Sequence, residues 1–443
     1  MQVMKWSVIA LAVAAGTTQM AVASSQSESK GFVEDSSFNI FNRALYHNRD
    51  FRNGAGNIGI DDDLTVDSDG DGKTNNDSDR YKNGYREEFG LGIRLLAESG
   101  FTQGTVGVGF DAHSLSSIKL DSGRGRYGSG QFAQTDSGRG DDTQTEVGGA
   151  IKFRVSDTVL KYGNQFVGSP VFSTDDSRIL PEVATGTLLT SNEIEGLELT
   201  AGRFTAISSQ TATGRDSNTQ KGHTLKSANI VGASYSFTDN FSGAIHASDV
   251  EDFWKKKYVN LNYNLPLADD QGLNFDFNYY KSNDDGRKLA GALDNKLWSL
   301  AAAYSLGAHK FTLAHQRSSG DTGYNYGIDG NGTIWTANSV QYSDFIGKDE
   351  RSWQARYDIN MATYGIPGLS FMTRYITGDN IDVGSGVDAK EHELDIEAKY
   401  VIQEGAAKDL SFRIRNATYR ANSSYDNDNN DFRLIVEYPL SVL

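Results

Sequence analysis

Two arginines near the C-terminus, one residue apart, are the clearest candidates for chemistry in this sequence. Arg413 and Arg415 stand in DLSFRIRNATYR, residues 409–420, where they alternate with Phe412 and Ile414. In a β-strand, successive side chains point to opposite faces, so the two guanidinium groups share one face and the two apolar side chains share the other. A planar guanidinium can bind both oxygens of a carboxylate, which makes carboxylate recognition the chemistry that this pair could perform.

An acidic segment just before the pair carries the opposite charge at the same spacing. It reads EHELDIEAKY and places acidic side chains at Glu391, Glu393, Asp395 and Glu397. In a neighbouring strand these carboxylates would face the same side as Arg413 and Arg415. They would either hold the guanidinium groups in position or partly cancel their attraction for anions. We expect both effects, with the acidic row at a different height for at least one arginine.

The same alternation of apolar and polar residues recurs elsewhere in the chain, at 258–265, 273–280, 298–306 and 432–443. Each segment is about ten residues long, the length of a tilted strand that crosses a bilayer. Beyond Ile414 the pattern breaks, because Asn416 falls on the apolar face. This break predicts a bulge or the membrane boundary there.

Short and long connections follow one another between these segments. Tight turns are expected at 98–100, 156–157, 195–196, 238–240 and 306–308, and looser ones at 265–271, 362–367 and 403–409. Longer polar stretches lie between them, at 51–84, 114–144, 164–185, 207–225, 284–295, 318–349, 378–389 and 421–430, with a brief one near 250–254. This order predicts an all-β fold, an 18-stranded antiparallel transmembrane β-barrel with both termini on the periplasmic side. The alternative is a soluble β-sandwich, but Tyr and Trp at the strand ends favour an interfacial girdle.

The composition agrees with an exported β-protein. Residues 1–23 combine Lys5, a short apolar run and an A-x-A site at 21–23, which predicts a signal peptide and leaves 24–443 for the barrel. The chain has 47 Gly, 5 Pro and no Cys, and its formal net charge is -16. Glycine-rich loops with many aromatic residues are typical of all-β architectures. After the signal peptide no apolar run reaches the roughly 18 residues of a membrane-spanning helix.

The stretch at about 164–185 is expected to fold into the barrel as a constriction loop. It contains Pro170 and Pro181, two of the 5 prolines, and proline fixes the backbone and removes a hydrogen-bond donor. Arg178 would then present its charge at the constriction, although an isolated loop arginine is more often a solvated surface charge.

An acidic loop offers the chain's one candidate metal site. In DSDGDGKTNNDSD, residues 67–79, the residues Asp67, Asp69 and Asp71 match the first three ligand positions of a calcium loop. The twelfth position is Ser78, where a bidentate Glu is usual. The alternative is a solvated acidic loop, bridged to lipopolysaccharide by divalent ions. No other cofactor is expected.

Enzyme and nucleic-acid functions find no support in the sequence. Its 7 histidines show no H-E-x-x-H spacing, and no G-x-S-x-G elbow occurs. The negative chain also offers no surface for nucleic acid.

Several segments together resemble one family, the OprD or outer-membrane carboxylate channel family. They include KGFVEDSSFNIFNRALYHNRDF at 30–51, ESGFTQGTVGVGFDAH at 98–113, ANSVQYSDF at 337–345, AKDLSFRIR at 407–415 and FRLIVEYPLSVL at 432–443. The resemblance covers essentially the whole mature chain. It implies an outer-membrane barrel through which small, carboxylate-bearing nutrients diffuse.

The resemblance also implies a ladder of basic residues along one wall of the lumen. Carried over by motif, its members here are Arg49, Arg178, Arg413, Arg415 and Arg433, with Arg86 as a further member. An opposing electronegative pocket would map to Tyr342, Asp344 and Tyr326. For Arg356 and Arg374, which also alternate inward, we expect wall ion pairs instead.

The expected partners are small carboxylate-bearing solutes, together with outer-membrane lipid and lipopolysaccharide. Amino acids or short peptides are the favoured solutes, and aromatic or other organic acids are the alternative. A different class of function is a barrel for surface interactions with a calcium-stabilised loop. The expected assembly is a monomer or a weak homotrimer.

Overall fold

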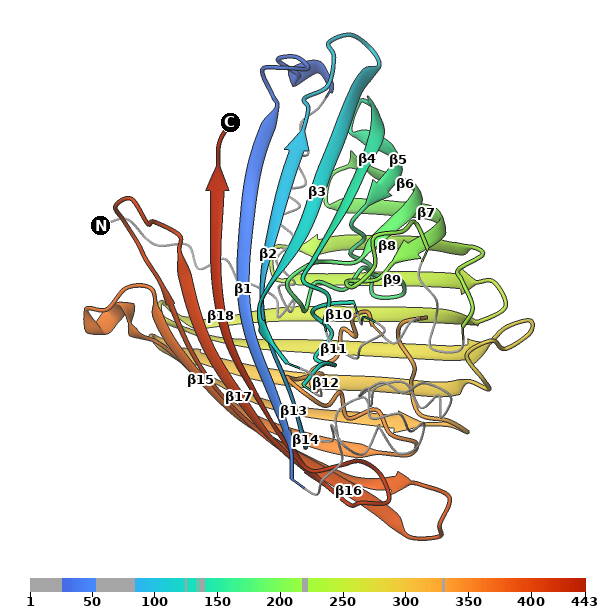
Figure 1. Ribbon diagram of the computed structural model, residues 1–443, viewed down its shortest axis with the longest axis vertical. Coiled ribbons are helices and arrows are strands. Elements are labelled where there is room, and N and C mark those ends of the chain that lie inside the picture. The colour runs from blue at the N-terminus through green and yellow to red at the C-terminus, as the bar shows by residue number, and fades with distance from the viewer. Residues whose placement is uncertain are drawn as a thin grey trace, which may run out of the picture.

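Eighteen antiparallel strands close into one sheet (Figure 1). The computed structural model describes residues 26–52, 84–123, 126–133, 135, 140–216, 222–328 and 331–443. Each strand pairs with its neighbours in sequence, and β1 (Ser37–Phe51) pairs with both β2 (Tyr85–Glu98) and β18 (Asn429–Ser441). The ring has no free edge, so every strand finds its hydrogen-bond partners inside the sheet. The predicted all-β barrel is confirmed.

The remaining strands complete the ring in chain order. They are β3 (Gly107–Ser122), β4 (Thr143–Val155), β5 (Thr158–Gln165), β6 (Val183–Ile194), β7 (Leu197–Ser208), β8 (Ala228–Thr238), β9 (Phe241–Val250), β10 (Trp254–Ala268), β11 (Gln271–Asp284), β12 (Asp294–Leu306), β13 (His309–Ser319), β14 (Arg351–Asn360), β15 (Leu369–Asp382), β16 (Asp388–Val401) and β17 (Ser411–Ala421). Two short 3₁₀ turns, η1 (Gln26–Glu28) and η2 (Met361–Tyr364), lie outside the sheet. Among the described residues, no helix is long and apolar enough to cross a membrane.

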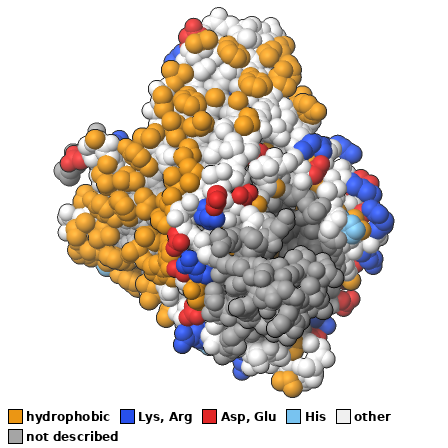
Figure 2. Space-filling view, viewed as in Figure 1, with side chains coloured by type: hydrophobic (Ala, Val, Ile, Leu, Met, Phe, Trp, Pro, Cys, Tyr) orange, Lys and Arg blue, Asp and Glu red, His pale blue; other side chains and the backbone are white. Residues whose placement is uncertain are grey.

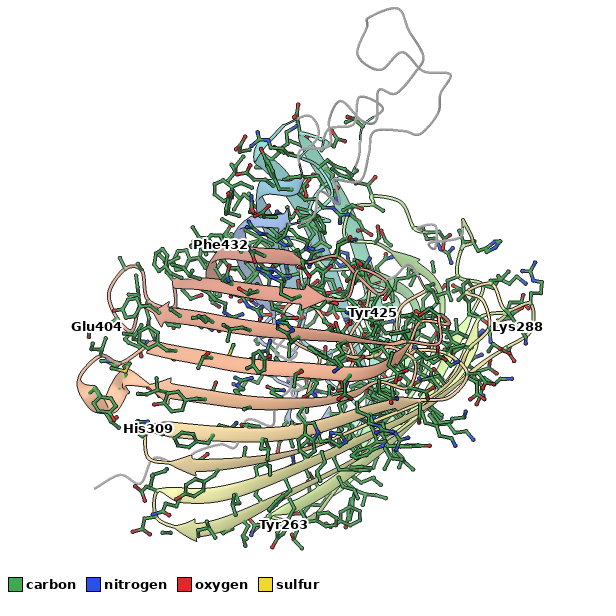
Figure 3. All side chains as sticks on the ribbon, turned by 90° about the horizontal axis from the view of Figure 1, so that it is seen from below. Tyr263, Lys288, His309, Glu404, Tyr425 and Phe432 are labelled. Carbon is green, nitrogen blue, oxygen red and sulfur yellow. The ribbon has the colours of Figure 1, made fainter. Side chains whose placement is uncertain are left out.

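Short and long connections lie at opposite ends of the barrel. His309 and Glu404, beside or in short turns, lie at the opposite end from Lys288, which belongs to the longer connection between β11 and β12 (Figure 3). Short turns at one end and longer loops at the other are the pattern of outer-membrane barrels, in which the turns are periplasmic.

Several predicted loops overlap the ends of strands, among them 164–185, which overlaps β5 and β6, and two predicted loops differ most from the structure. The predicted loop 114–144 includes the second half of β3, and the predicted loop 378–389 includes the end of β15 and the start of β16. In β3 the inward residues of this half include Leu115 and Ser117, both buried. Small polar residues suit a water-facing wall as well as a loop, so composition alone does not separate the two.

The barrel is apolar outside and polar inside. Val147 and Ile245 are exposed on the outer surface, whereas Glu393, Asp395 and Asp431 are fully buried. Hydrophobic side chains cover broad areas of the face seen in Figure 2. This inverted pattern is what a bilayer requires of a barrel that encloses water.

In strand β17 inward and outward side chains alternate over its whole length. Phe412 and Ile414 are 41% and 49% exposed, and Ala417 and Tyr419 are buried. The register to β16 and β18 runs through Asn416 without a shift. The predicted bulge after Ile414 is therefore wrong, and the membrane boundary is left as the explanation of the broken pattern.

Candidate substrate-binding site in the lumen

The segment between β5 and β6, residues 166–182, folds inward and is fixed to the wall by two arginines. Arg43 on β1 and Arg94 on β2 both reach Asp176, at 2.9 Å and 2.6 Å. The same guanidinium groups donate to the backbone carbonyls of Arg178 and Ile179. All three charged side chains are almost fully buried, so the segment is held by charge-assisted hydrogen bonds out of contact with bulk water.

Apolar contacts add to this anchor. Ile179 and Leu180 pack against Leu45, Leu115 and Phe132 in one buried cluster. Arg43 also pairs with Glu437 at 2.8 Å. Arg43 and Arg94 therefore face two carboxylates, Asp176 and Glu437, and this group carries no net charge for a solute.

Arg178 belongs to this segment and has no carboxylate as hydrogen-bond partner among the described residues. Its Nε donates to the carbonyl of Ser129 at 2.7 Å, and its Nη1 donates to Ser177 Oγ at 2.9 Å. Burial, followed by the positive charge of Arg433, lowers the pKa of Arg178 to about 10. The guanidinium thus stays charged at neutral pH.

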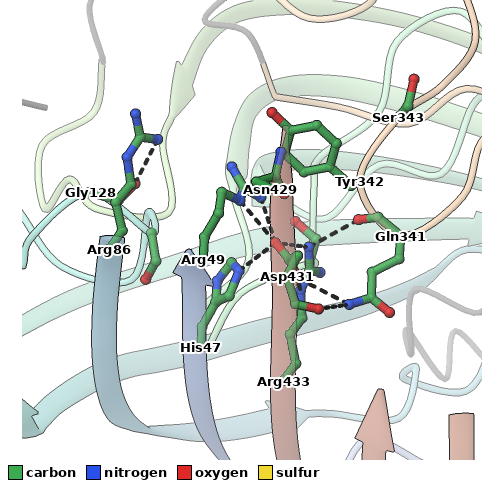
Figure 4. Close-up of polar contacts among 12 residues, drawn as sticks. His47, Arg49, Arg86, Gly128, Gln341, Tyr342, Ser343, Asn429, Asp431 and Arg433 are labelled. Carbon is green, nitrogen blue, oxygen red and sulfur yellow. Dashed lines mark hydrogen bonds and ion pairs between the residues drawn. The ribbon is translucent and has the colours of Figure 1, made fainter. Parts of the chain in front are cut away.

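A second group of charges surrounds Asp431 on β18 (Figure 4). Arg49 Nη2 lies 2.8 Å and Arg433 Nε 2.6 Å from its carboxylate oxygens. His47 Nε2 lies 2.8 Å away, and Gln341 donates to Asp431 Oδ1 at 3.0 Å. Two guanidinium groups share one carboxylate, which leaves an excess positive charge at this level of the wall.

A third group of charges, lower on the wall, also has two guanidinium groups and one carboxylate. Arg413 Nε lies 3.5 Å and Arg415 Nε 3.1 Å from the two oxygens of Glu397. Arg415 is the direct cross-strand partner of Arg433, so the two arginine groups are adjacent. In both groups a single acid positions two arginines without neutralising them.

Arg86 on β2 extends the row beyond Arg49. It is the direct cross-strand partner of Arg49, donates to the carbonyl of Gly128 at 3.3 Å and lies over the ring of Phe51. The structure therefore places five of the six candidate ladder arginines on the neighbouring strands β2, β1, β18 and β17. Arg178 joins them from the inward-folded segment.

The acidic row of β16 divides into separate contacts. Asp395 pairs with Arg374 at 2.6 Å, a buried wall ion pair of the kind expected. Glu393 accepts hydrogen bonds from the backbone N–H groups of Tyr342 and Ser343, at 2.9 Å and 2.8 Å. Of the four acidic residues, only Glu397 pairs with Arg413 and Arg415.

Tyr342 and Asp344 belong to the connection between β13 and β14, residues 320–350. This connection is hydrogen-bonded to the inner wall, because Gln341 donates to the carbonyl of Asp431 and the Tyr342 N–H donates to Glu393. The ring of Tyr342 lies 4.6 Å from the guanidinium of Arg49, and its hydroxyl donates to Asp426. Burial raises the pKa of Tyr342 to about 12. Tyr342 therefore stands beside the arginine row and stays protonated.

Asp344 and Tyr326 form a separate acidic group. Ser339 Oγ donates to Asp344 at 2.5 Å, and burial raises the pKa of Asp344 to about 6. The pKa of Tyr326 is raised mainly by the negative charge of Asp344. The negative charge of Asp175 raises it further. The structure thus brings Asp344, Tyr326 and the inward-folded segment together.

Several residues of the site were missed in the sequence. Asp431 stands two residues before Arg433 on the same strand face, and this D-x-R spacing was a signal that could have found it. Arg43 and Arg94 carry no such local signal, because their partners are distant in sequence. The candidate calcium ligands Asp67, Asp69 and Asp71 and the predicted signal peptide lie outside the described residues.

Known proteins of similar sequence and structure are porins. A family model described as outer membrane porin, OprD family, matches residues 30–442. Porin D of Pseudomonas aeruginosa is 46% identical over 471 residues, which cover 100% of both chains. The crystal structure of OprD from the same organism is 44% identical, with a TM-score of 0.76 over 95% of this chain and 99% of that chain. The crystal structure of P. aeruginosa OpdK with vanillate is 32% identical, with a TM-score of 0.80 over 93% and 100%.

Proposed function

The chain belongs to the OprD family of bacterial outer-membrane porins, and we propose that it is a selective channel for small carboxylate-bearing nutrients. As a porin it passes small solutes and is not an enzyme. The observation that carries the proposal is the two-to-one ratio of guanidinium groups to carboxylates at Asp431 and Glu397. Each group attracts an anion while its own acid keeps the arginines in place.

Electrostatics explains why a row of such groups suits diffusion. Two unit charges about 4 Å apart attract by about 4 kcal/mol at an intermediate dielectric, against about 1 kcal/mol in bulk water. A single deep site would retain the solute, whereas several adjacent groups let a carboxylate move from one to the next. Arg178, Arg49, Arg433, Arg415 and Arg413 supply that sequence of steps.

The acidic group favours amino acids or short peptides among the carboxylates. Asp344 has a pKa of about 6, so it carries a negative charge at neutral pH. A solute whose carboxylate binds the arginine row could place an ammonium group toward Asp344 and Tyr326. Simple acids lack that second contact.

Aromatic acids are the alternative substrates. The OpdK structure, 32% identical to this chain, was solved with vanillate, which is an aromatic carboxylate. The ring of Tyr342 beside Arg49 offers a surface on which an aromatic solute could stack. The predicted assembly, a monomer or weak homotrimer, remains a prediction.

Uptake by a porin-deficient strain tests the proposal. The strain expressing this protein is given amino acids, dipeptides, aromatic acids and neutral sugars of similar size, and uptake is followed with labelled solutes. We expect uptake of amino acids or dipeptides to exceed that of sugars. Equal uptake of all solutes of one size would contradict a carboxylate-selective channel, and highest uptake of aromatic acids would establish the alternative.

A further inference from the structure

Four cationic side chains on the outer face of the barrel form no ion pair with any residue that the structure describes. They are Lys257 on β10, Lys296 on β12, Arg317 on β13 and Arg351 on β14, and all four are exposed. Lys281 on β11 joins them and is paired with Asp294. We call these five residues the outer basic row.

The strand register places these charges next to one another. Lys281 is the direct cross-strand partner of both Lys257 and Lys296. Arg317 is likewise the direct partner of Arg351, beyond which Asp379 follows on β15. Like charges directly opposite each other destabilise a sheet unless another charge compensates them.

Other lysines near the long-loop end of the barrel form ion pairs with acidic residues of this chain. Lys255 pairs with Asp285 at 2.8 Å, and Lys288 pairs with Asp284 at 3.1 Å. Lys226 pairs with Asp252 at 2.5 Å. On the outer face of β10–β14, the described cations that form no ion pair are the four named first, Lys257, Lys296, Arg317 and Arg351.

The row lies at the boundary between the loops and the apolar belt. One step down the same faces stand Val259, Trp298 and Trp353, which are outward-facing and apolar or aromatic. The row is near the long-loop end of the barrel, the end at which Lys288 lies in Figure 3 and the end that faces the cell exterior. Lys and Arg side chains gather at the right edge of Figure 2, where the right-hand ends of β9–β12 lie in Figure 1.

We propose that the outer basic row binds the phosphate groups of a phosphorylated glycolipid, the lipid A part of lipopolysaccharide, in the outer leaflet. The acyl chains would lie along the apolar belt below the row, and two phosphates would bridge the opposed cations. Each Lys or Arg near a charged membrane surface contributes about 1 kcal/mol of attraction to anionic lipid. Phosphate bridging also removes the repulsion between Lys257, Lys281 and Lys296.

The test compares two variants that lose the same charge in the purified full-length porin. The first changes Lys257, Lys296, Arg317 and Arg351 to Gln, and keeps the pair Lys281–Asp294. The control changes Lys226, Lys255, Lys288 and Lys348 to Gln, each of which is paired with an acid of this chain. Binding of bisphosphorylated lipid A and of dephosphorylated lipid A in detergent is measured by native mass spectrometry.

We expect the first variant to bind bisphosphorylated lipid A at least about a hundredfold more weakly than the parent. The control should bind it nearly as well as the parent, and the dephosphorylated lipid should bind weakly to all three proteins. Equal weakening of both variants, or equal binding of the two lipids by the parent, would overturn the proposal. So would a change of oligomeric state in the first variant with lipid binding unchanged, because the row would then be a contact between copies.

Folding is checked separately. The heat-dependent shift of the barrel on gels and the single-channel conductance should match those of the parent in both variants. If the first variant fails to fold, replacement of the same lysines by arginine supplies the test. Lys257→Arg with Lys296→Arg should keep the affinity for bisphosphorylated lipid A, and loss of affinity would contradict a role for charge.

Discussion

Arg413 and Arg415 share Glu397, and this arrangement leaves them able to attract a carboxylate. An arginine with an acid of its own has no such surplus. Arg356 shows the contrast, because it pairs with Asp358 on its own strand at 2.6 Å. We therefore propose that luminal arginines of this barrel differ in function according to how many guanidinium groups each acid serves.

Changing Arg413 and Arg415 to Ala should lower uptake of the preferred carboxylate about tenfold, the factor that corresponds to losing about 1.4 kcal/mol of attraction. Uptake of an uncharged solute of the same size should change little. The measurement is uptake of labelled solute by the porin-deficient strain at equal protein level. Arg356→Ala is the matched control and should behave like the parent. Unchanged uptake in the double variant would assign both arginines to the wall structure.

Asp344 should make transport depend on pH. Its pKa of about 6 lies above the usual value for Asp because of burial, so the side chain is neutral below pH 6 and charged above it. Lowering the pH from about 7.5 to about 5 should reduce flux of a zwitterionic amino acid relative to a monocarboxylic acid, since the contact for the ammonium group is lost.

Asp344→Asn is the control for this pH effect. In proteoliposomes, the ratio of amino-acid flux to monocarboxylic-acid flux through this variant should be the same at both pH values. It should equal the ratio that the parent shows at low pH. A parent protein whose flux ratio is the same at both pH values would count against a role for Asp344 in binding the ammonium group.

At the scale of elements, the inward-folded segment depends on one buried acid. Asp176 pairs with both Arg43 and Arg94, and loss of one partner of a buried charge pair costs about 3–5 kcal/mol. Asp176→Asn should release the segment from the wall and raise single-channel conductance, with more current noise.

Asp216→Asn serves as its control, because Asp216 pairs with Arg215 at an exposed site and exposed pairs contribute about 0–1 kcal/mol. Its conductance should equal that of the parent in planar bilayers. Both variants should keep the heat-dependent gel shift of a folded barrel. Parental conductance in Asp176→Asn would show that the apolar contacts of Ile179 and Leu180 suffice to hold the segment.

The elements were the most predictable part of the structure. Side chains alternate with a period of two in a strand, so Phe412 and Ile414 could be assigned to the lipid face and Arg413 and Arg415 to the lumen from the sequence alone. Strand ends were less certain where the wall is built of small polar residues, as in the second half of β3. The contacts of the inward-folded segment could not be predicted, because Asp176 and its partners Arg43 and Arg94 lie far apart in the chain.

At the scale of the whole molecule, net charge is a poor guide to the lumen. The chain has a formal charge of -16, yet the strands β17, β18, β1 and β2 line one wall with excess positive charge. Some described acidic residues near the loops pair with lysines, as Asp252 does with Lys226 and Asp285 does with Lys255. The sequence and its resemblance to the family predicted an inward direction for Arg49, Arg413, Arg415 and Arg433, but not for Arg43, Arg94 or Asp431. How many arginines each acid serves depends on side-chain contacts across neighbouring strands.

Flux of an amino acid and of its amide through the reconstituted porin tests most directly whether the channel selects a carboxylate. The two solutes have nearly the same size and the same ammonium group, and differ in the carboxylate. With proteoliposomes at pH 7.5, we predict that the amino acid crosses about tenfold faster, the factor that corresponds to about 1.4 kcal/mol. Equal rates, or faster passage of the amide, would contradict the proposed role of the arginine row.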